Sequence, residues 1–211
     1  MLALSGGCNN KIKKYANQIE AMSVDQQNTA GPPQVSLGRI AAPVEDAAAT
    51  GAATAGNMVI EVFEVQLITR LSGLVSPGEL AKVSRETATN AMNSSGPYPV
   101  DESSRWRLVL TTTGWGISAD VDQPASAWIS IDASAYGPKG KRIWRRSVSC
   151  SRDLSGYMPS GMATTQTAVN IGMVTGMSDA DLLAVYDDVA RQCGQDVASR
   201  LNSTIQRAKS K

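Results

Sequence analysis

The 211-residue chain carries 20 basic and 19 acidic side chains, which gives a net charge of +1. Nucleic-acid binding needs a concentrated positive field, and this balance provides none, so we expect no nucleic-acid partner. Histidine is absent, which excludes Ser-His-Asp and Cys-His catalysis and the commonest metal ligand, so we expect no catalytic residue, metal or cofactor. Hydrophobic residues at 42% and charged residues at 18% are typical of a globular protein rather than a disordered chain.

The chain opens with a short apolar segment and small residues that lead to Cys8, as at the end of a secretory signal. Residues 4–8 resemble the lipobox of bacterial lipoproteins, with Ser5 at the position where that family prefers Leu. The resemblance implies that residues 1–8 are a signal remnant cut after Gly7. It also implies that Cys8 carries acyl chains, palmitate among them, that anchor the protein in a lipid bilayer.

The two residues after Cys8 bear on localisation. Asn9 and Asn10 stand in place of the Asp that retains enterobacterial lipoproteins at the inner membrane. The resemblance therefore implies a lipid-anchored protein on the periplasmic face of the outer membrane. The alternative is a cytoplasmic protein in which Cys8 has no special role.

Residues 9–57 have the composition of a flexible tether. They are rich in Ala, Gly, Pro, Gln and Thr, with a weak helical pattern near their start. Because such a composition buries little surface and breaks helices, we expect a tether with one short polar helix. For residues 47–55 the alternative is a helix of small residues packed closely on a neighbour.

An apolar segment of helical length covers residues 58–74. Its large side chains recur at the spacing of one helix face: Phe63, Leu67, Leu71 and Leu74. This spacing predicts a helix, with a strand over residues 59–65 as the alternative. Ser76, Pro77 and Glu79 then predict a second helix that begins with a capping box and ends near residues 93–97.

Three strands of a meander are predicted at residues 106–113, 127–136 and 142–150. The second strand alternates most clearly, with Ile129 and Ile131 inward and Asp132 outward. Gly114 and Gly116 flank Trp115, which predicts a β-bulge at the end of the first strand.

Residues 151–176, rich in Gly, Ser, Thr and Met, are predicted to form a long loop. Ser178 then opens the clearest helix, whose apolar residues recur at every fourth position from Val185 to Ile205 and whose end is basic. The expected fold class is α+β, with a three-stranded (or larger) antiparallel sheet packed by two N-terminal helices and one long C-terminal helix. We expect a single domain over residues 58–211.

The carboxylates of this domain are scattered along the sequence. Those considered for chemistry are Asp120, Asp122, Asp132, Asp179, Asp181, Asp187 and Asp188. Asp120 and Asp122 could begin an oxygen-ligand site, but the Gly and terminal Glu of an EF-hand loop are missing. We therefore interpret the carboxylates as solvated surface groups.

The tryptophans gather on or beside the three predicted strands: Trp106, Trp115, Trp128 and Trp144. We expect at least two in the core, and one or two on a surface that binds a partner. Residues 96–150, with Gly140, Lys141 and Trp144 in a Gly-Lys-x-x-Trp strand, resemble a group of envelope lipoproteins. That group is similar in style to the small domains that assist peptidoglycan synthases, lipid-transport complexes and secretion channels. The resemblance implies other envelope proteins as partners.

If Cys8 carries the lipid, Cys150 and Cys193 remain as an even pair. Cys150 ends the third predicted strand on the face of Trp144, and Cys193 lies within the apolar stripe of the last helix. The two orientations predict a disulfide between Cys150 and Cys193. The alternative is two buried free thiols.

Together these patterns predict a lipid-anchored periplasmic interaction or assembly module of the bacterial cell envelope, not an enzyme, whose oligomeric state the sequence leaves open. Two alternatives remain. One is a carrier of an apolar ligand such as lipid in a cavity between helices and sheet, and the other is a periplasmic enzyme that uses carboxylates. A large apolar pocket would favour the carrier, and an exposed tryptophan patch the interaction module.

Overall fold

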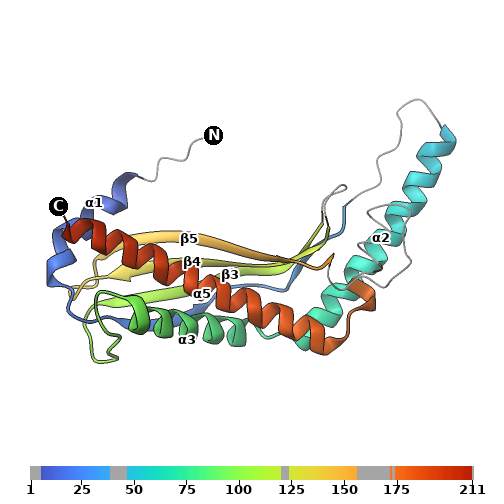
Figure 1. The fold of residues 1–211 in the computed structure, drawn as a ribbon. Helices are drawn as coiled ribbons and strands as arrows, with labels where there is room; N and C mark the ends of the chain where they lie inside the picture. The colour runs from blue at the N-terminus through green and yellow to red at the C-terminus, as the bar shows by residue number, and fades with distance from the viewer. Residues whose placement is uncertain (1–5, 39–46, 120–123, 156–171, 173, 211) are drawn as a thin grey trace.

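The structure, a computed structural model, describes residues 6–38, 47–119, 124–155, 172 and 174–210. It shows an α+β arrangement in which one mixed sheet of five strands is covered on one face by two helices (Figure 1). The predicted fold class is thereby confirmed, with a larger sheet than the minimum of three strands.

The sheet is built around a three-stranded antiparallel meander, as predicted. Its strands are β3 (Arg107–Ser118), β4 (Ser126–Tyr136) and β5 (Arg142–Asp153). In β4 the alternation is complete, because Ile129, Ile131, Ala133 and Ala135 are fully buried while the residues between them are partly exposed. The register of β3 against β4 shifts between Thr112 and Gly114, which confirms the predicted bulge.

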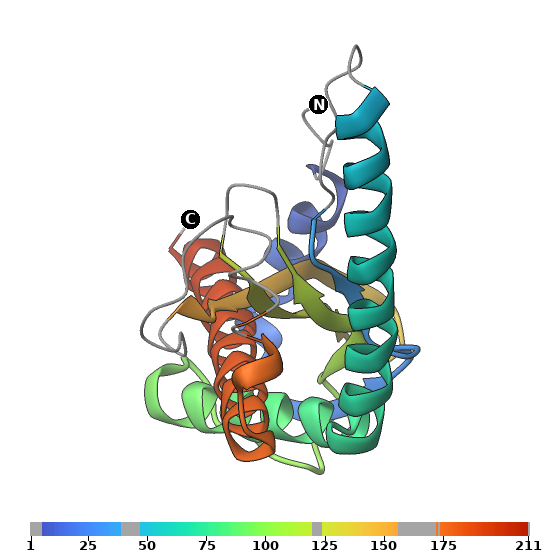
Figure 2. The same cartoon turned by 90° about the vertical axis from the view of Figure 1, so that its right-hand side faces the viewer.

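Helices α3 (Pro77–Ser95) and α5 (Asp179–Lys209) lie side by side across one face of the sheet (Figures 1 and 2). The predicted apolar stripe of α5 is buried along its whole length, from Leu182 to Ile205. Ser178 and Asp181 form a full capping box at its start. At α3 the predicted box does not form, because the Ser76 side chain makes no cap hydrogen bond and Glu79 pairs with Lys82 at 3.3 Å.

The prediction of a flexible tether over residues 9–57 was wrong. This segment contains α1 (Gly6–Tyr15), the 3-10 helix η1 (Ala16–Gln18), β1 (Ser23–Asn28) and β2 (Gln34–Ser36). Both strands pair in parallel with β3, and Ile12, Ile19, Met22 and Leu37 are buried in the core. Ile12, Ile19 and Leu37 each stand between polar residues or glycine, so this segment predicted only a weak helical pattern and no buried strand.

Helix α2 (Ala47–Leu74) begins well before the predicted residue 58, and residues 47–55 are helical, as in the alternative for them. The close packing that this alternative included concerns side chains outside the described ones. It does not cover the sheet, which corrects the expectation of two N-terminal helices packed on it. Figures 1 and 2 show α2 at one end of the strands, rising away from the body of the domain. Its C-terminal half is held there by the ion pair of Arg70 with Asp179 at 2.7 Å and by the Leu37 N–H, which donates to Glu64 at 2.9 Å.

Part of α2 presents apolar side chains to solvent. Met58, Val59, Val62 and Val65 are each more than half exposed, whereas Ile60, Leu67 and Leu71 on the other side are buried. In the described part of the chain, no helix is both long enough and apolar enough to span a bilayer.

Candidate functional site

The sheet face opposite α3 and α5 is the candidate site, because it is polar and carries the partly exposed side chains of every second residue. In β4 these residues form a row with an aromatic ring at each end: Trp128, Ser130, Asp132, Ser134 and Tyr136. The alternation that buries Ile129 and Ile131 on one side therefore places this row on the other.

A hollow of about 500 Å³ opens at the end of this face that carries Tyr136. It is lined by Asp25, Gln27, Thr29, Arg107, Val109, Thr111, Thr113, Asp132, Ser134, Tyr136, Arg142 and Arg145. Tyr136 is directly opposite Arg107 on β3 and Arg142 on β5, so an arginine stands on each neighbouring strand beside it. The Arg107 guanidinium carbon lies 6.0 Å from the centroid of that ring.

Asp132 is held in its charged form at the floor of the hollow. The Ser147 hydroxyl donates a hydrogen bond to its carboxylate, and Arg145 lies at 2.5 Å. The hydrogen bond from Ser147, followed by the hydrogen bond and positive charge of Arg145, holds the pKa of Asp132 below its usual range, against the opposing effect of burial. Asp132 therefore acts here as an acceptor and an ion-pair partner.

A second hollow, of about 600 Å³, lies on the same face at the other end of β4. It is lined by Gln34, Val35, Ser36, Ile117, Ser118, Ser126, Trp128, Ser149 and Ser151. The Trp128 indole is the large aromatic group of this hollow, and serine hydroxyls surround it. The two hollows give the uncovered face an extended concave surface with one aromatic side chain in each.

The four tryptophans, expected to contribute one or two rings to a binding surface, separate clearly. Trp115 and Trp144 are 1% and 0% exposed and belong to the core, so they are excluded from a surface role. Trp106 is 9% exposed and packs against Tyr15 with a centroid separation of 5.8 Å. Trp128 is the one of the four that lines either hollow described above on the uncovered face.

The arginines that line the first hollow were missed by the sequence analysis. Lys141, Arg142 and Arg145 form a basic run in the sequence, but that run could equally be a solvated face. Only the pairing of β4 with β5 and β3 brings Arg107 and Arg142 to either side of Tyr136.

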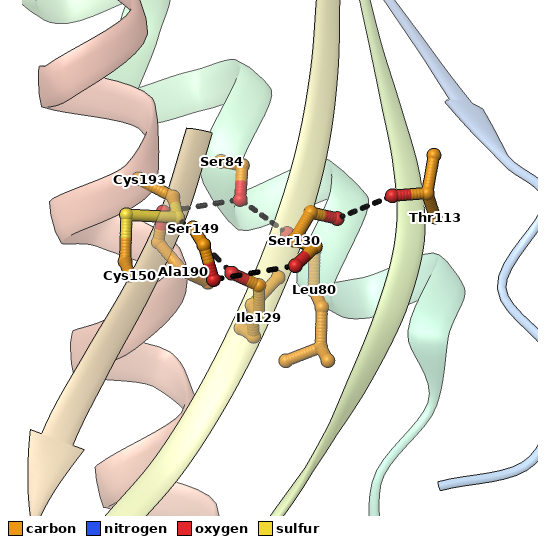
Figure 3. The surroundings of a disulfide bond; sticks show 9 residues. All are labelled: Leu80, Ser84, Thr113, Ile129, Ser130, Ser149, Cys150, Ala190 and Cys193. Carbon is orange, nitrogen blue, oxygen red and sulfur yellow. Dashed lines mark hydrogen bonds between the residues drawn. A yellow bond between two sulfur atoms is a disulfide. The ribbon is translucent and has the colours of Figure 1, made fainter. Parts of the chain in front are cut away.

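The predicted disulfide between Cys150 and Cys193 is present, with a Cα–Cα distance of 5.6 Å. Figure 3 shows Cys150 of β5 facing Cys193 of α5 beside Ile129, so the bond joins the sheet to the helix that covers it. Both cysteines are buried. Cys8, the predicted lipidation site, lies in the first half of α1.

The remaining carboxylates considered from the sequence have structural partners. Asp179 pairs with Arg70, Asp181 caps α5, and Asp187 and Asp188 pair with Arg191 and Arg152. Asp120 and Asp122 lie outside the described residues. No cluster of three or more potential metal ligands occurs among the residues that the structure describes.

No family model matches the sequence, and no curated protein matches it significantly. Among solved structures, the chain is similar to a DUF330-family protein from Xanthomonas campestris, with a TM-score of 0.46 and 12% identity, covering 91% of this chain and 88% of that one. A minor lipoprotein from Acinetobacter baumannii gives a TM-score of 0.38 at 9% identity, covering 58% of this chain and 84% of that one. A Caulobacter crescentus protein provisionally described as a lipoprotein gives a TM-score of 0.33 at 12% identity, covering 63% of this chain and 85% of that one. These values are too low to assign the chain to a family.

Proposed function

We propose that this protein is a non-catalytic interaction module of the bacterial cell envelope, anchored by a lipid on Cys8 to the periplasmic face of the outer membrane. The lipobox resemblance at residues 4–8 supports the anchor. The disulfide between Cys150 and Cys193 supports an oxidising compartment, where such bonds persist.

The observation that carries the proposal is the uncovered, hollowed sheet face. Arginine and tyrosine side chains are enriched at binding hot spots, because a guanidinium offers several directed donors and a ring offers rigid contact area. Arg107, Tyr136 and Arg142 combine these groups at one level of the sheet. The face therefore suits a partner protein that presents carboxylates and other hydrogen-bonding groups.

The two alternative functions have less support on this surface. A general acid at neutral pH needs a raised carboxyl pKa, whereas the pKa of Asp132 is lowered. The hollows described at the sheet are lined by strand residues of the face away from α3 and α5. The carrier predicted as an alternative would instead hold its apolar ligand in a cavity between these helices and the sheet.

A photo-crosslinking residue at Thr113, which is exposed beside the first hollow, tests the interaction face in cells of the native organism. We expect a crosslinked envelope protein from this position and none from Gln195, which is exposed on α5. The double variant Tyr136→Ala/Arg142→Ala should abolish the crosslinked product. Equal yields from Thr113 and Gln195, or a product that survives the double variant, would refute the proposed face.

Mass spectrometry of the protein from its own membranes tests the anchor separately. The expected N-terminal peptide begins at Cys8 and carries acyl chains, and membrane fractionation should place it in the outer membrane. An unmodified peptide that still contains Met1 would rule out the lipid anchor.

A further inference from the structure

Several chain segments that are distant in sequence meet at one end of the molecule, around Trp106. The Tyr15 ring at the end of α1 packs on the Trp106 indole, and the Ser23 N–H donates to the Trp106 carbonyl at 2.8 Å. Gly137, in the turn between β4 and β5, lies so close that an added Cβ would be 3.2 Å from the same indole. Figure 1 places the C-terminus beside α1, and α1 contacts both α5 and β5.

These segments bring most of the described lysines to this end. The exposed basic residues here are Lys11, Lys13 and Lys14 of α1, Arg105 before β3, Lys139 and Lys141 of the β4–β5 turn, and Arg207 and Lys209 in the last turn of α5. Lys82 of α3 is the one described lysine elsewhere. The carboxylates in the same segments are Glu20, Asp101 and Glu102.

The other end of the molecule has a different balance, because exposed basic side chains described there form ion pairs. Arg70 pairs with Asp179, Arg152 with Asp188, and Lys82 with Glu79. A net charge of +1 for the whole chain therefore conceals an uneven distribution, with the unbalanced positive charge at the end that carries α1.

We infer that this basic end, defined by the eight lysines and arginines named above, lies against a membrane surface that contains acidic phospholipids. Charge complementarity favours such a surface, because each lysine or arginine near acidic lipid headgroups strengthens binding about fivefold. The basic end is also the end that carries Cys8 in α1. A basic surface beside the acyl chains would add an electrostatic attachment to the hydrophobic one.

This contact would set the orientation of the whole domain. The sheet extends between the basic end and α2, so attachment at the basic end directs α2 away from the bilayer (Figure 1). The uncovered sheet face would then be accessible from the side. The inference rests on the proposed function for the lipid anchor, but the basic surface itself can be tested without the lipid.

Vesicle flotation of the full chain with Cys8→Ser is the direct test, because this variant cannot be lipidated. At low ionic strength we expect binding to phosphatidylcholine vesicles that contain phosphatidylglycerol, and little binding to phosphatidylcholine alone. Raising the ionic strength should release the protein because salt screens exposed charges.

Two triple variants and a matched control locate the surface. Lys11→Gln/Lys13→Gln/Lys14→Gln and Lys139→Gln/Lys141→Gln/Lys209→Gln should each weaken binding on the order of a hundredfold, which is three fivefold steps. The control Lys82→Gln/Arg152→Gln/Arg191→Gln removes the same charge from three exposed ion pairs and should bind like the parent. The two test sets lie on different elements, so a folding defect in one would leave the other informative.

Equal binding to neutral and acidic vesicles, or an equal loss in the control, would overturn the inference. Failure of the proposed lipid anchor gives a different result. In that case the native protein would lack acyl chains on Cys8, while flotation of the Cys8→Ser chain would still follow acidic lipid content.

Discussion

At the scale of single residues, burial has different consequences for two tyrosines. The Tyr98 hydroxyl donates to Asn202 at 3.2 Å, whereas the Tyr186 hydroxyl has no hydrogen-bond partner among the described residues. Burial raises the pKa of both phenols, so both stay neutral. Tyr98→Phe should lower the free energy of unfolding by about 1–3 kcal/mol, because the buried Asn202 loses its partner. Tyr186→Phe should leave the free energy of unfolding unchanged or raise it, since the lost hydroxyl has no partner in the described part of the chain and the ring contact with Trp115 remains. Urea unfolding of the two variants checks the difference, and equal losses would contradict it.

Asp132 gives a prediction on pH at the same scale. Its pKa in the folded protein is lowered, so its stabilisation is present above the ordinary carboxyl pKa and is lost as the pH falls through the lowered value. Asp132→Asn should lower the free energy of unfolding at pH 7 by about 1 kcal/mol or less, as for a partly exposed ion pair. The difference from the parent should shrink at pH 3, measured by denaturant unfolding at both pH values. A difference that is constant with pH would show that the carboxylate charge does not stabilise the fold.

At the scale of elements, the contact between α3 and α5 depends on a glycine. A Cβ on Gly194 would lie 2.3 Å from the Ser84 carbonyl oxygen, and the Ser84 hydroxyl donates to the Ala190 carbonyl at 3.0 Å. Gly194→Ala must push the two helices apart and should lower the free energy of unfolding by about 1–3 kcal/mol. Gly73 of α2 has no atom within 4 Å of an added Cβ. Gly73→Ala is the control and should raise stability by up to about 1 kcal/mol, through helix propensity alone.

At the scale of the whole molecule, the disulfide links the sheet to the helix that covers it. Its cysteines are separated by 43 residues, and closing a loop of this length in the unfolded chain stabilises the fold by roughly 3–4 kcal/mol in the chain-entropy model. The double variant Cys150→Ala/Cys193→Ala should lower the free energy of unfolding by an amount of this order, measured by guanidinium unfolding. Cys8→Ser should leave the free energy of unfolding unchanged in the same assay. A stability that does not change when the pair is removed would show that the unfolded chain is not restrained by the bond.

The sequence by itself determined the features that depend on local periodicity. The alternation around Ile129 and Ile131, and the fourfold spacing from Val185 to Ile205, each define one buried face without reference to the rest of the chain. Two apolar faces in one domain are buried against each other, so the pairing of Cys150 with Cys193 followed from their places on these faces.

Only the tertiary structure decided the strand pairing of the N-terminal segment, the arginine-tyrosine row and the basic end. Each of these features depends on partners far away in the sequence. β1 and β2 pair with β3 about 80 residues later. Gly116 permits the pairing of β2, since a Cβ there would lie 1.8 Å from the Gln34 carbonyl oxygen. The row of Arg107, Tyr136 and Arg142 exists only through strand register. The basic end likewise requires α1, a turn and the last turn of α5 to meet. Charges that are scattered in a sequence become a surface only when packing places them together.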